Sequence, residues 1–291
     1  LIAQDSWTQK ANYSGAGQWI PFSFSIGDKG YIGTGSDDAS DIGKSDFWEY
    51  NPVTNAWTQK ADFGGGTRWG AIGFSIGNKG YAGLGCVSSY NWRKDMWEYN
   101  PAENSWRRLG DFGTGIPPES GGGFRYSAVS FSIGNKGYMG TGNYRVSPAY
   151  LAIYLNDFLV YDPVTDIWTR KADVPEQGRH SAIGLSIGNK GYIGTGYYYY
   201  DTRLKDFWEY DPAVNTWTRK ADFGGIQRVA AAAFTIGNKG YVGTSACNCW
   251  VNGQYYGYLN DIWEYSPATD SWLQKATFPG SERLAGASFS I

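Results

Sequence analysis

Three short phrases return in the same order along the chain, and this internal repetition limits the possible folds more than any other feature. The phrase Ile-Gly-(Asn/Asp)-Lys-Gly-Tyr begins at Ile26, Ile76, Ile133, Ile187 and Ile236. A phrase of the type Asp-Phe-Trp-Glu-Tyr-Asp-Pro begins at Asp46, Asp95, Asp157, Asp206 and Asp261. A third phrase is centred on Trp57, Trp106, Trp168, Trp217 and Trp272, with an extra copy at Trp7. Successive copies lie 49 to 62 residues apart, which indicates five similar structural units.

Each unit has the pattern of four short β-strands joined by tight turns. In the second unit, residues 69–76 form the first strand, and residues 78–80 form a hairpin turn because Asn and Gly accept a positive φ at low cost. The second strand covers residues 81–85, the third covers 96–99, and the fourth carries Trp106. Aromatic residues make up 18% of the chain, which suits short strands, and the periodicity of helices is missing.

Four-stranded units repeated around a ring are the blades of a β-propeller, so we predict an all-β propeller with antiparallel blades. The first strand of each unit is rich in Gly, Ala and Ser, which suits the crowded position next to the central axis. The Trp and Tyr residues of strands three and four fill the wider space between blades. We expect one domain over residues 1–291, with complete blade units at approximately 18–57, 68–106, 125–168, 179–217 and 228–272.

The two ends of the chain carry single strands of a further unit. Residues 1–10 resemble a lone fourth strand and residues 283–291 a lone first strand, so we expect the two ends to share a split sixth blade in a six-bladed ring. Strands two and three of that blade are not in the sequence, which favours a natural chain that continues beyond Ile291. Two alternatives stay open, a five-bladed ring with frayed ends and a filament in which a neighbouring molecule supplies strands.

The units resemble kelch repeats over essentially the whole chain. The resemblance rests on a Tyr in strand three followed seven residues later by a Trp in strand four, as in Tyr50/Trp57, Tyr99/Trp106, Tyr161/Trp168, Tyr210/Trp217 and Tyr265/Trp272. The usual double glycine at the end of strand two is here Gly-Thr-Gly, as in residues 33–35 and 194–196, which puts only the local turn geometry in doubt. Residues 1–4 resemble the end of a secretory signal peptide of Bacteroidetes surface proteins, which implies an extracellular or cell-surface location.

Composition removes several classes of function. The formal net charge is only −2, so nothing indicates a nucleic-acid partner, and no apolar run is long enough for a transmembrane helix. We expect no metal and no cofactor, because the chain has a single His and three Cys. A bridge between Cys247 and Cys249 would span one intervening residue, so we expect these two residues and Cys86 to be free thiols.

The loops between strands two and three are long and unequal, and they lie on the same face as the connections between units. This face is the expected binding face, since a constant scaffold beneath variable loops is a common way to build a binding site. Aromatic side chains are frequent in these loops and can stack on sugar rings or anchor a protein. They are Tyr90, Trp92, Tyr144, Tyr150, Tyr154, Tyr197, Tyr198, Tyr199, Tyr200, Trp250, Tyr255, Tyr256 and Tyr258. The alternative is that they cover blade edges.

A second candidate site is a ring of residues just before strand one. It contains the arginines Arg68, Arg125, Arg179, Arg228 and Arg283, with Gln18 in the first unit. These guanidinium groups could bind a carboxylate or a sulfate, but strict recurrence favours structural pairing with the Asp that opens each strand three. The next residue varies from unit to unit and is the better pocket candidate: Trp19, Trp69, Tyr126, His180, Val229 and Leu284.

We therefore predict a non-catalytic module that binds a glycan or a protein partner at or outside the bacterial cell surface. A copper oxidase of the galactose-oxidase type needs more than one His, and His180 is alone. The remaining enzyme hypothesis follows from a resemblance to bacterial six-bladed kelch proteins and is a sialic-acid mutarotase or epimerase. Its candidate residues are Glu176, Arg179, His180 and Arg228. A third hypothesis is a structural unit of a surface filament or adhesin.

Overall fold

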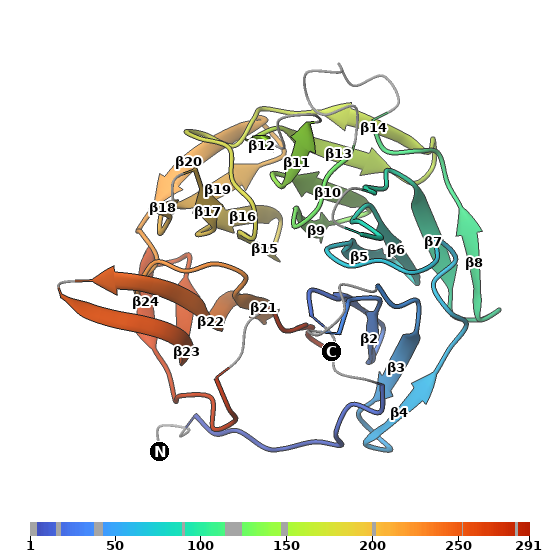
Figure 1. Cartoon of the computed structure of the whole chain (residues 1–291), viewed down its shortest axis with the longest axis horizontal. Helices are drawn as coiled ribbons and strands as arrows, with labels where there is room; N and C mark the ends of the chain where they lie inside the picture. Colours follow the sequence, from blue (N-terminus) through green and yellow to red (C-terminus); the bar gives the residue numbers. More distant parts are fainter. Residues whose placement is uncertain are drawn as a thin grey trace.

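The chain folds as a ring of β-sheets in the computed structural model (Figure 1). The structure describes residues 5–15, 19–37, 43–88, 91–113, 124–146, 151–199, 202–251, 253–282 and 285–291. All regular elements in this part of the chain are strands, as the repeats predict. Within the same residues, no helix is long and apolar enough to span a membrane.

Five antiparallel sheets of four strands form the blades of a β-propeller, which confirms the predicted fold class. Blade one contains β1 (Phe22–Ile26), β2 (Lys29–Gly33), β3 (Phe47–Asn51) and β4 (Ala56–Gln59). Blade two contains β5 (Ile72–Ile76), β6 (Lys79–Gly83), β7 (Met96–Asn100) and β8 (Ser105–Arg108). Blade three contains β9 (Val129–Ile133), β10 (Lys136–Gly140), β13 (Phe158–Asp162) and β14 (Ile167–Arg170).

The last two blades repeat the same order and carry additional strands in their loops. Blade four contains β15 (Ile183–Ile187), β16 (Lys190–Gly194), β19 (Phe207–Asp211) and β20 (Thr216–Lys220). Blade five contains β21 (Ala232–Ile236), β22 (Lys239–Val251), β23 (Gln254–Ser266) and β24 (Ser271–Gln274). Small hairpins project from blades three and four: β11 (Asn143–Val146) with β12 (Leu151–Tyr154), and β17 (Tyr197–Tyr198) with β18 (Thr202–Arg203).

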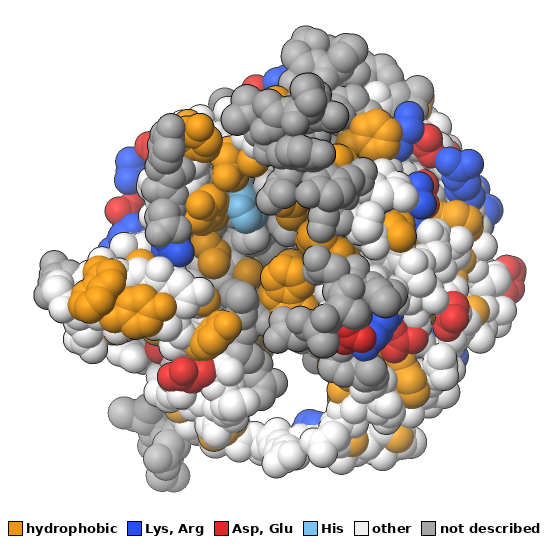
Figure 2. Space-filling model, in the orientation of Figure 1, with side chains coloured by type: hydrophobic (Ala, Val, Ile, Leu, Met, Phe, Trp, Pro, Cys, Tyr) orange, Lys and Arg blue, Asp and Glu red, His pale blue; other side chains and the backbone are white. Residues whose placement is uncertain are grey.

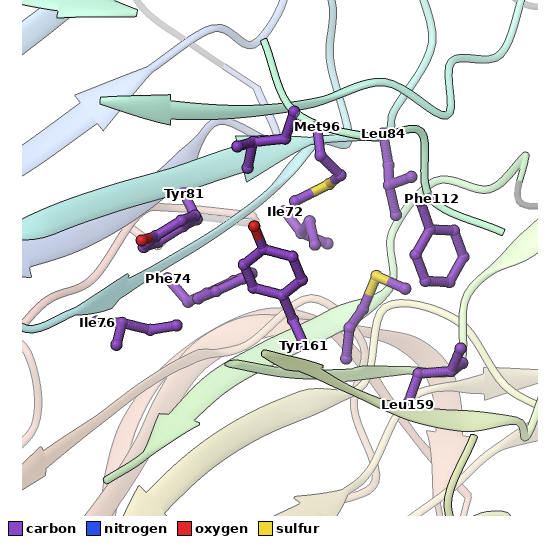
Figure 3. Close-up of a cluster of buried hydrophobic side chains, with 11 residues drawn as sticks. Ile72, Phe74, Ile76, Tyr81, Leu84, Met96, Phe112, Leu159 and Tyr161 are labelled. Carbon is purple, nitrogen blue, oxygen red and sulfur yellow. The ribbon is translucent and has the colours of Figure 1, made fainter. Parts of the chain in front are cut away.

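The hydrophobic core lies between neighbouring blades rather than inside one sheet. Alternate residues of strand one point at the next blade, so β1, β5, β9 and β15 all bury their first, third and fifth residues. Figure 3 shows one such interface, where Phe74 and Ile76 of blade two meet Leu159 and Tyr161 of blade three. The same arrangement recurs in three further clusters, so each blade needs its neighbour to bury its apolar face.

A ring of backbone hydrogen bonds joins the blades at the mouth of the central channel. The amide of Ala285 donates to the carbonyl of Ala230, that of Ala230 to Ser181, and that of Ser181 to Ser127, at 2.8 to 3.1 Å. Ser127 donates to Gly70 and Gly70 to Ile20 in the same way. These linking residues all have a φ between 51° and 65°, which costs energy for the non-glycine members. A left-handed residue cannot continue a regular strand, so strand one of each blade begins after it. In blade two the left-handed residue is Gly70, and the strand begins at Ile72 and not at residue 69.

A second set of contacts joins the blades at their outer edge. In each blade the left-handed Asn or Asp of the turn before strand four accepts the hydroxyl of the strand-three Tyr and a backbone amide of the preceding blade. In blade four, Asn215 accepts from Tyr210 at 2.8 Å and from the amide of Ala172 at 3.0 Å. Burial raises the pKa of Tyr210 to about 12, so its hydroxyl keeps the proton that it donates. The indole of Trp217 donates to the carbonyl of the same Ala172 at 2.8 Å.

The two terminal segments lie between blade five and blade one (Figure 1). The indole of Trp7 donates to the carbonyl of Ala276 at 2.9 Å, as the indoles of Trp57, Trp106, Trp217 and Trp272 donate to an Ala carbonyl of the preceding unit. Ser288 takes the place of a first strand, because its hydroxyl bonds the backbone of Ala233 and its carbonyl accepts from Ser23. Residues 5–15 and 285–291 thus occupy the outer and inner positions of a sixth unit, without strand pairing among the described residues.

The Asn215→Ala variant tests the outer contact. We expect a loss of about 2 kcal/mol in the free energy of unfolding, because two polar groups lose their acceptor. Asn215→Asp is the matched control: Asp166 and Asp270 occupy the equivalent positions in blades three and five, so we expect a change within about 0.5 kcal/mol. Urea unfolding at neutral pH measures both variants, and an equal loss in both would contradict the assigned role.

Candidate functional site

The four described arginines before strand one are buried scaffold residues rather than rim residues. Arg68, Arg125, Arg179 and Arg228 have no exposed surface. Each guanidinium group makes two hydrogen bonds to the Asp that precedes strand three in its own blade, and a third to a backbone carbonyl at the end of strand two. In blade three, Arg125 binds Asp157 at 2.6 and 2.7 Å and the carbonyl of Thr141 at 3.1 Å. This geometry agrees with the structural alternative for the arginines and leaves little donor capacity for a ligand.

The residue after each arginine is placed differently and lines the mouth of the channel. Trp19, Trp69, Tyr126, His180 and Val229 each form a short backbone bridge with the residue that follows the Gly-x-Gly-type turn after strand two. The first four side chains form a row across four blades. Ring centroids are 5.7 Å apart between Trp19 and Trp69, 5.3 Å between Trp69 and Tyr126, and 6.4 Å between Tyr126 and His180.

Tyrosines from the small hairpins extend this row at His180. The ring of Tyr154, at the end of β12, stacks on the imidazole with centroids 5.6 Å apart, and Tyr197 of β17 lies 5.1 Å from it. Tyr198 and Tyr199 contact Tyr154 edge-on at 5.7 and 6.3 Å. We call these eight residues, Trp19, Trp69, Tyr126, Tyr154, His180, Tyr197, Tyr198 and Tyr199, the aromatic rim. Figure 2 shows the single His, in pale blue, among hydrophobic side chains on this face.

Most of the aromatic rim is partly accessible and offers a polar edge as well as an apolar face. Trp69 is buried, Tyr199 is exposed, and the other six side chains are intermediate. The hydroxyl of Tyr126 accepts from Asn143, and the Nδ1 atom of His180 lies 2.8 Å from the hydroxyl of Ser181. A surface of Trp, Tyr and His can stack on a flat apolar ligand face while its hydroxyl groups fix orientation.

Buried polar atoms beneath the aromatic rim lack partners. They are the hydroxyl of Ser36, the indole nitrogen of Trp69 and the amide oxygen of Asn143, none of which has a hydrogen-bond partner among the described residues. Ser36 and Asn143 are the bridge partners of Trp19 and Tyr126. The three atoms therefore lie in blades one, two and three, next to the first three residues of the row. Buried polar groups are normally paired, so this cluster is unusual. Residues close to these three in sequence, and their equivalents in blade four, also carry buried atoms without a hydrogen-bond partner among the described residues, namely the Nε atoms of Arg68 and Arg179 and the hydroxyl groups of Thr34, Thr141 and Thr195.

The other aromatic residues of the loop face lie outside the aromatic rim. Trp92 borders a separate cavity with Phe124 and the charged residues Arg93 and Lys94. Tyr144 is a partly buried residue of β11. The long hairpin of β22 and β23 carries Tyr256 and the exposed side chains Trp250, Tyr255 and Tyr258, with Trp250 and Tyr255 in contact at 5.6 Å. The predicted loop residues Tyr90, Tyr150 and Tyr200 and the ring residues Gln18, Arg283 and Leu284 lie outside the described part of the chain.

The central channel is lined by the small residues of the first strands. A cavity of about 210 Å³ there is bordered by Ser23, Ser75, Ser132 and Ser186 among others. Several of these hydroxyl groups hold the blades together, since Ser132 donates to the carbonyl of Ser75 and Thr235 to that of Ser186. The channel hydroxyls thus contribute to the interfaces between the innermost strands.

The expectation of free thiols is wrong for two of the three cysteines. Cys247 and Cys249 form a disulfide, with Cα atoms 5.1 Å apart. The pairing of β22 with β23 shifts register between Ala246 and Cys249, and Asn248 has a φ of 46°. In a regular strand, residues two apart point to the same face but their Cα atoms lie about 6.6 Å apart, and the bulge brings the two Cys residues closer than that. Cys86 is a buried thiol, as expected.

The residues of the mutarotase hypothesis do not form a common charged site. Arg179 and Arg228 are bound to Asp206 and Asp261. Glu176 forms an ion pair with Arg219 at 3.3 Å. Of these four candidates, His180 is the one that belongs to the aromatic rim.

Sequence reasoning missed the polar layer beneath the rim. Ser36 and Asn143 occupy the position directly after the Gly-x-Gly turn, which varies as Ser36, Cys86, Asn143 and Tyr197 across the first four units. That variability was a usable signal, since it matches the variability after the arginines. It did not reveal that the two positions pair through backbone bridges.

Comparison with known proteins supports the fold alone. No protein-family model matches the chain, and no curated protein matches it. The solved structure of YjhT is similar, with a TM-score of 0.72 and 19% sequence identity over 94% of this chain and 87% of that chain. At this identity the likeness carries no function, and it places the chain in the class of β-propeller proteins.

The Asp95→Asn variant tests the scaffold role of the arginine pairs. Burial opposes the charged form of Asp95, but hydrogen bonds and the charge of Arg68 lower its pKa below the usual value. The pair therefore stabilises the fold above about pH 4, and this contribution is lost as the pH falls through the folded-state pKa. We expect Asp95→Asn to cost about 3 kcal/mol at pH 7, because it leaves Arg68 buried without its counterion.

Thermal unfolding at pH 7, 5 and 3 measures this contribution. The difference between wild type and Asp95→Asn should shrink from pH 5 to pH 3. Asp173→Asn, which removes a surface ion pair with Arg170, is the control and should cost less than about 1 kcal/mol. A pH-independent difference for Asp95→Asn would contradict the assignment.

Proposed function

We propose that this chain is a non-catalytic binding module that recognises a carbohydrate at the aromatic rim. The observation that carries the proposal is the row of rings from Trp19 through Trp69 and Tyr126 to His180, continued by Tyr154 and Tyr197. One face of a pyranose ring is apolar and its edge carries hydroxyl groups. A partly accessible surface of Trp and Tyr matches that combination.

The eight side chains of the aromatic rim are rings without a carboxylate, ammonium or guanidinium group, although the guanidinium group of Arg203 lies beside them, 5.8 Å from the centroid of the Tyr197 ring. Because stacking surface outweighs charge in this set, a neutral glycan is favoured over an acidic one. The four described arginines are already bound by Asp carboxylates. The uncharged polar atoms of Ser36, Trp69 and Asn143 are of the kind that bind hydroxyl groups, if the side chains above them move aside. The same arrangement speaks against acid–base chemistry on a sugar acid, which needs converging titratable groups.

We further propose that the repeats are of the kelch type and that the module works outside the cell, at a bacterial surface. The kelch assignment rests on the Tyr and Trp seven residues apart, which meet across strands three and four in pairs such as Tyr210 and Trp217. The extracellular assignment is supported by the Cys247–Cys249 disulfide, because such bonds persist mainly in oxidising compartments. A protein partner is the alternative ligand.

A glycan array, followed by calorimetric titration of the best neutral oligosaccharide, tests the proposed function. We expect selective binding that falls about fivefold in each of the variants Trp19→Ala, Tyr126→Ala and His180→Ala, since one stacking contact contributes about 1 kcal/mol. Trp250→Ala, on the projecting hairpin, is the control and should bind as wild type does. An empty array, or binding that only the Trp250 variant loses, would exclude a carbohydrate site at the rim.

A further inference from the structure

A crevice on the loop face of blade two is lined by cationic and aromatic side chains. It has a volume of about 310 Å³ and lies between the β6–β7 loop, the end of β8 and the start of blade three. Its lining includes Trp92, Arg93, Lys94, Arg108 and Phe124. None of the eight residues of the aromatic rim borders it, so the crevice is a separate site.

The construction of the propeller repeats this crevice in blade five with a different lining. The equivalent crevice has a volume of about 300 Å³. Leu259 and Asn260 stand there in the places of Arg93 and Lys94, directly before the Asp that precedes strand three. Its far wall carries Glu282 instead of an aromatic residue. The crevice is therefore a property of the scaffold, whereas the cationic lining is a property of blade two.

Arg93 occupies a position that other blades fill with a buried leucine. Leu155 in blade three and Leu204 in blade four are 6% and 8% exposed. Arg93 keeps the backbone bond of this position, because its amide donates to the carbonyl of Gly85 at 2.8 Å as that of Leu155 donates to Gly142 at 2.9 Å. Its guanidinium group is half-buried and has no ion pair with another described residue. Its donors are thus available to a ligand.

The charges around the crevice leave a positive excess. Arg68 and Asp95 at its inner wall neutralise each other in the buried pair. The other two cations share one carboxylate, because Asp111 lies 2.7 Å from the guanidinium group of Arg108 and 3.7 Å from the ammonium group of Lys94. Exposed pairs of this kind are weak, so both cations can turn to an anionic ligand. This excess occurs in a chain whose formal net charge is −2.

The aromatic lining and the size of the crevice narrow the kind of anion. Phe124 is 40% exposed, and the ammonium group of Lys94 lies 5.6 Å from the centroid of its ring, which holds that cation at the crevice. Trp92 adds a second half-buried ring. An acidic peptide side chain would use the cations but not the rings, whereas a sugar ring with an acidic substituent uses both. The volume is that of a small ligand pocket.

We propose that the crevice binds one acidic sugar unit by its carboxylate or sulfate group. Arg93, Lys94 and Arg108 hold the anionic group, and the rings of Trp92 and Phe124 border the sugar ring. The proposal is independent of the ligand of the aromatic rim, because the two sites share no residue.

Titration calorimetry with methyl glucuronide, sulfated glucose and methyl glucoside tests the proposal. We expect saturable binding of at least one of the two acidic sugars and none of the neutral glucoside. The acidic sugar that binds more tightly identifies the anionic group. Binding should weaken as the salt concentration rises, because the three cations are partly exposed.

Variants that borrow residues from other blades locate the binding. Arg93→Leu and Lys94→Asn introduce the residues that blade five has at these positions, so the chain should stay folded. Each should weaken binding of the acidic sugar at least about tenfold, since each removes a charged hydrogen-bond donor. Asp111→Asn removes the competing carboxylate and should strengthen binding about threefold. Arg107→Leu is the matched control, because Arg107 pairs with Glu98 outside the crevice and should leave binding unchanged.

Four results would overturn the proposal. They are absence of binding, equal binding of glucuronide and glucoside, equal loss in the Arg93 and Arg107 variants, and tighter binding of a triglutamate peptide than of either acidic sugar. The Trp19→Ala variant separates the two sites. It should weaken the neutral glycan at the aromatic rim and leave the acidic sugar unaffected, and a loss of the acidic sugar would place that ligand at the rim instead.

Discussion

The structure depends on the contact between one blade and the next. A four-stranded sheet of this size cannot bury its own apolar face, and the alternate side chains of strand one therefore pack against the neighbouring sheet. Two polar systems hold that contact in place. The amides of the left-handed residues link the blades at the channel mouth, and the Asn or Asp of the outer turn links them at the circumference. Both systems use equivalent positions in successive units, although the residue type at the channel mouth varies among Ile, Gly, Ser and Ala.

The buried Arg–Asp ion pairs belong to the scaffold of the blades, whereas the residue after each Arg belongs to the candidate site. Each Arg–Asp pair sits directly beneath the mouth of the channel and joins the residue before strand one to the start of strand three. A buried charge whose partner is removed is costly, which gives a physical reason for the recurrence of the pair in blades two to five. The residue that follows the Arg is anchored by a backbone bridge, so its side chain can differ without disturbing the blade. The recurrent Arg–Asp pair therefore fixes the backbone, and the variable residue after the Arg presents a different side chain at the equivalent position of each blade.

The space between blades five and one shows that the burial of a blade's apolar face depends on the neighbouring blade. The terminal segments reproduce the inner and outer contacts of a blade with Ser288, Phe289 and Trp7. Without middle strands between them in the described chain, Ile236 remains exposed although its sequence context matches that of the buried Ile residues. Burial at these positions is a property of the adjacent unit and not of the residue itself.

The sequence by itself determined the repeat, the four-stranded unit and the propeller, because periodic turns and alternating apolar residues are local signals that recur in register. It also indicated that the arginines pair with the Asp of strand three, since both recur in fixed order. The tertiary structure decided which variable residues meet. Trp19, Trp69 and Tyr126 lie about fifty residues apart and become neighbours only when the ring curves. It also decided the Cys247–Cys249 disulfide, because a bulge set by cross-strand register brings together side chains that a regular strand holds apart.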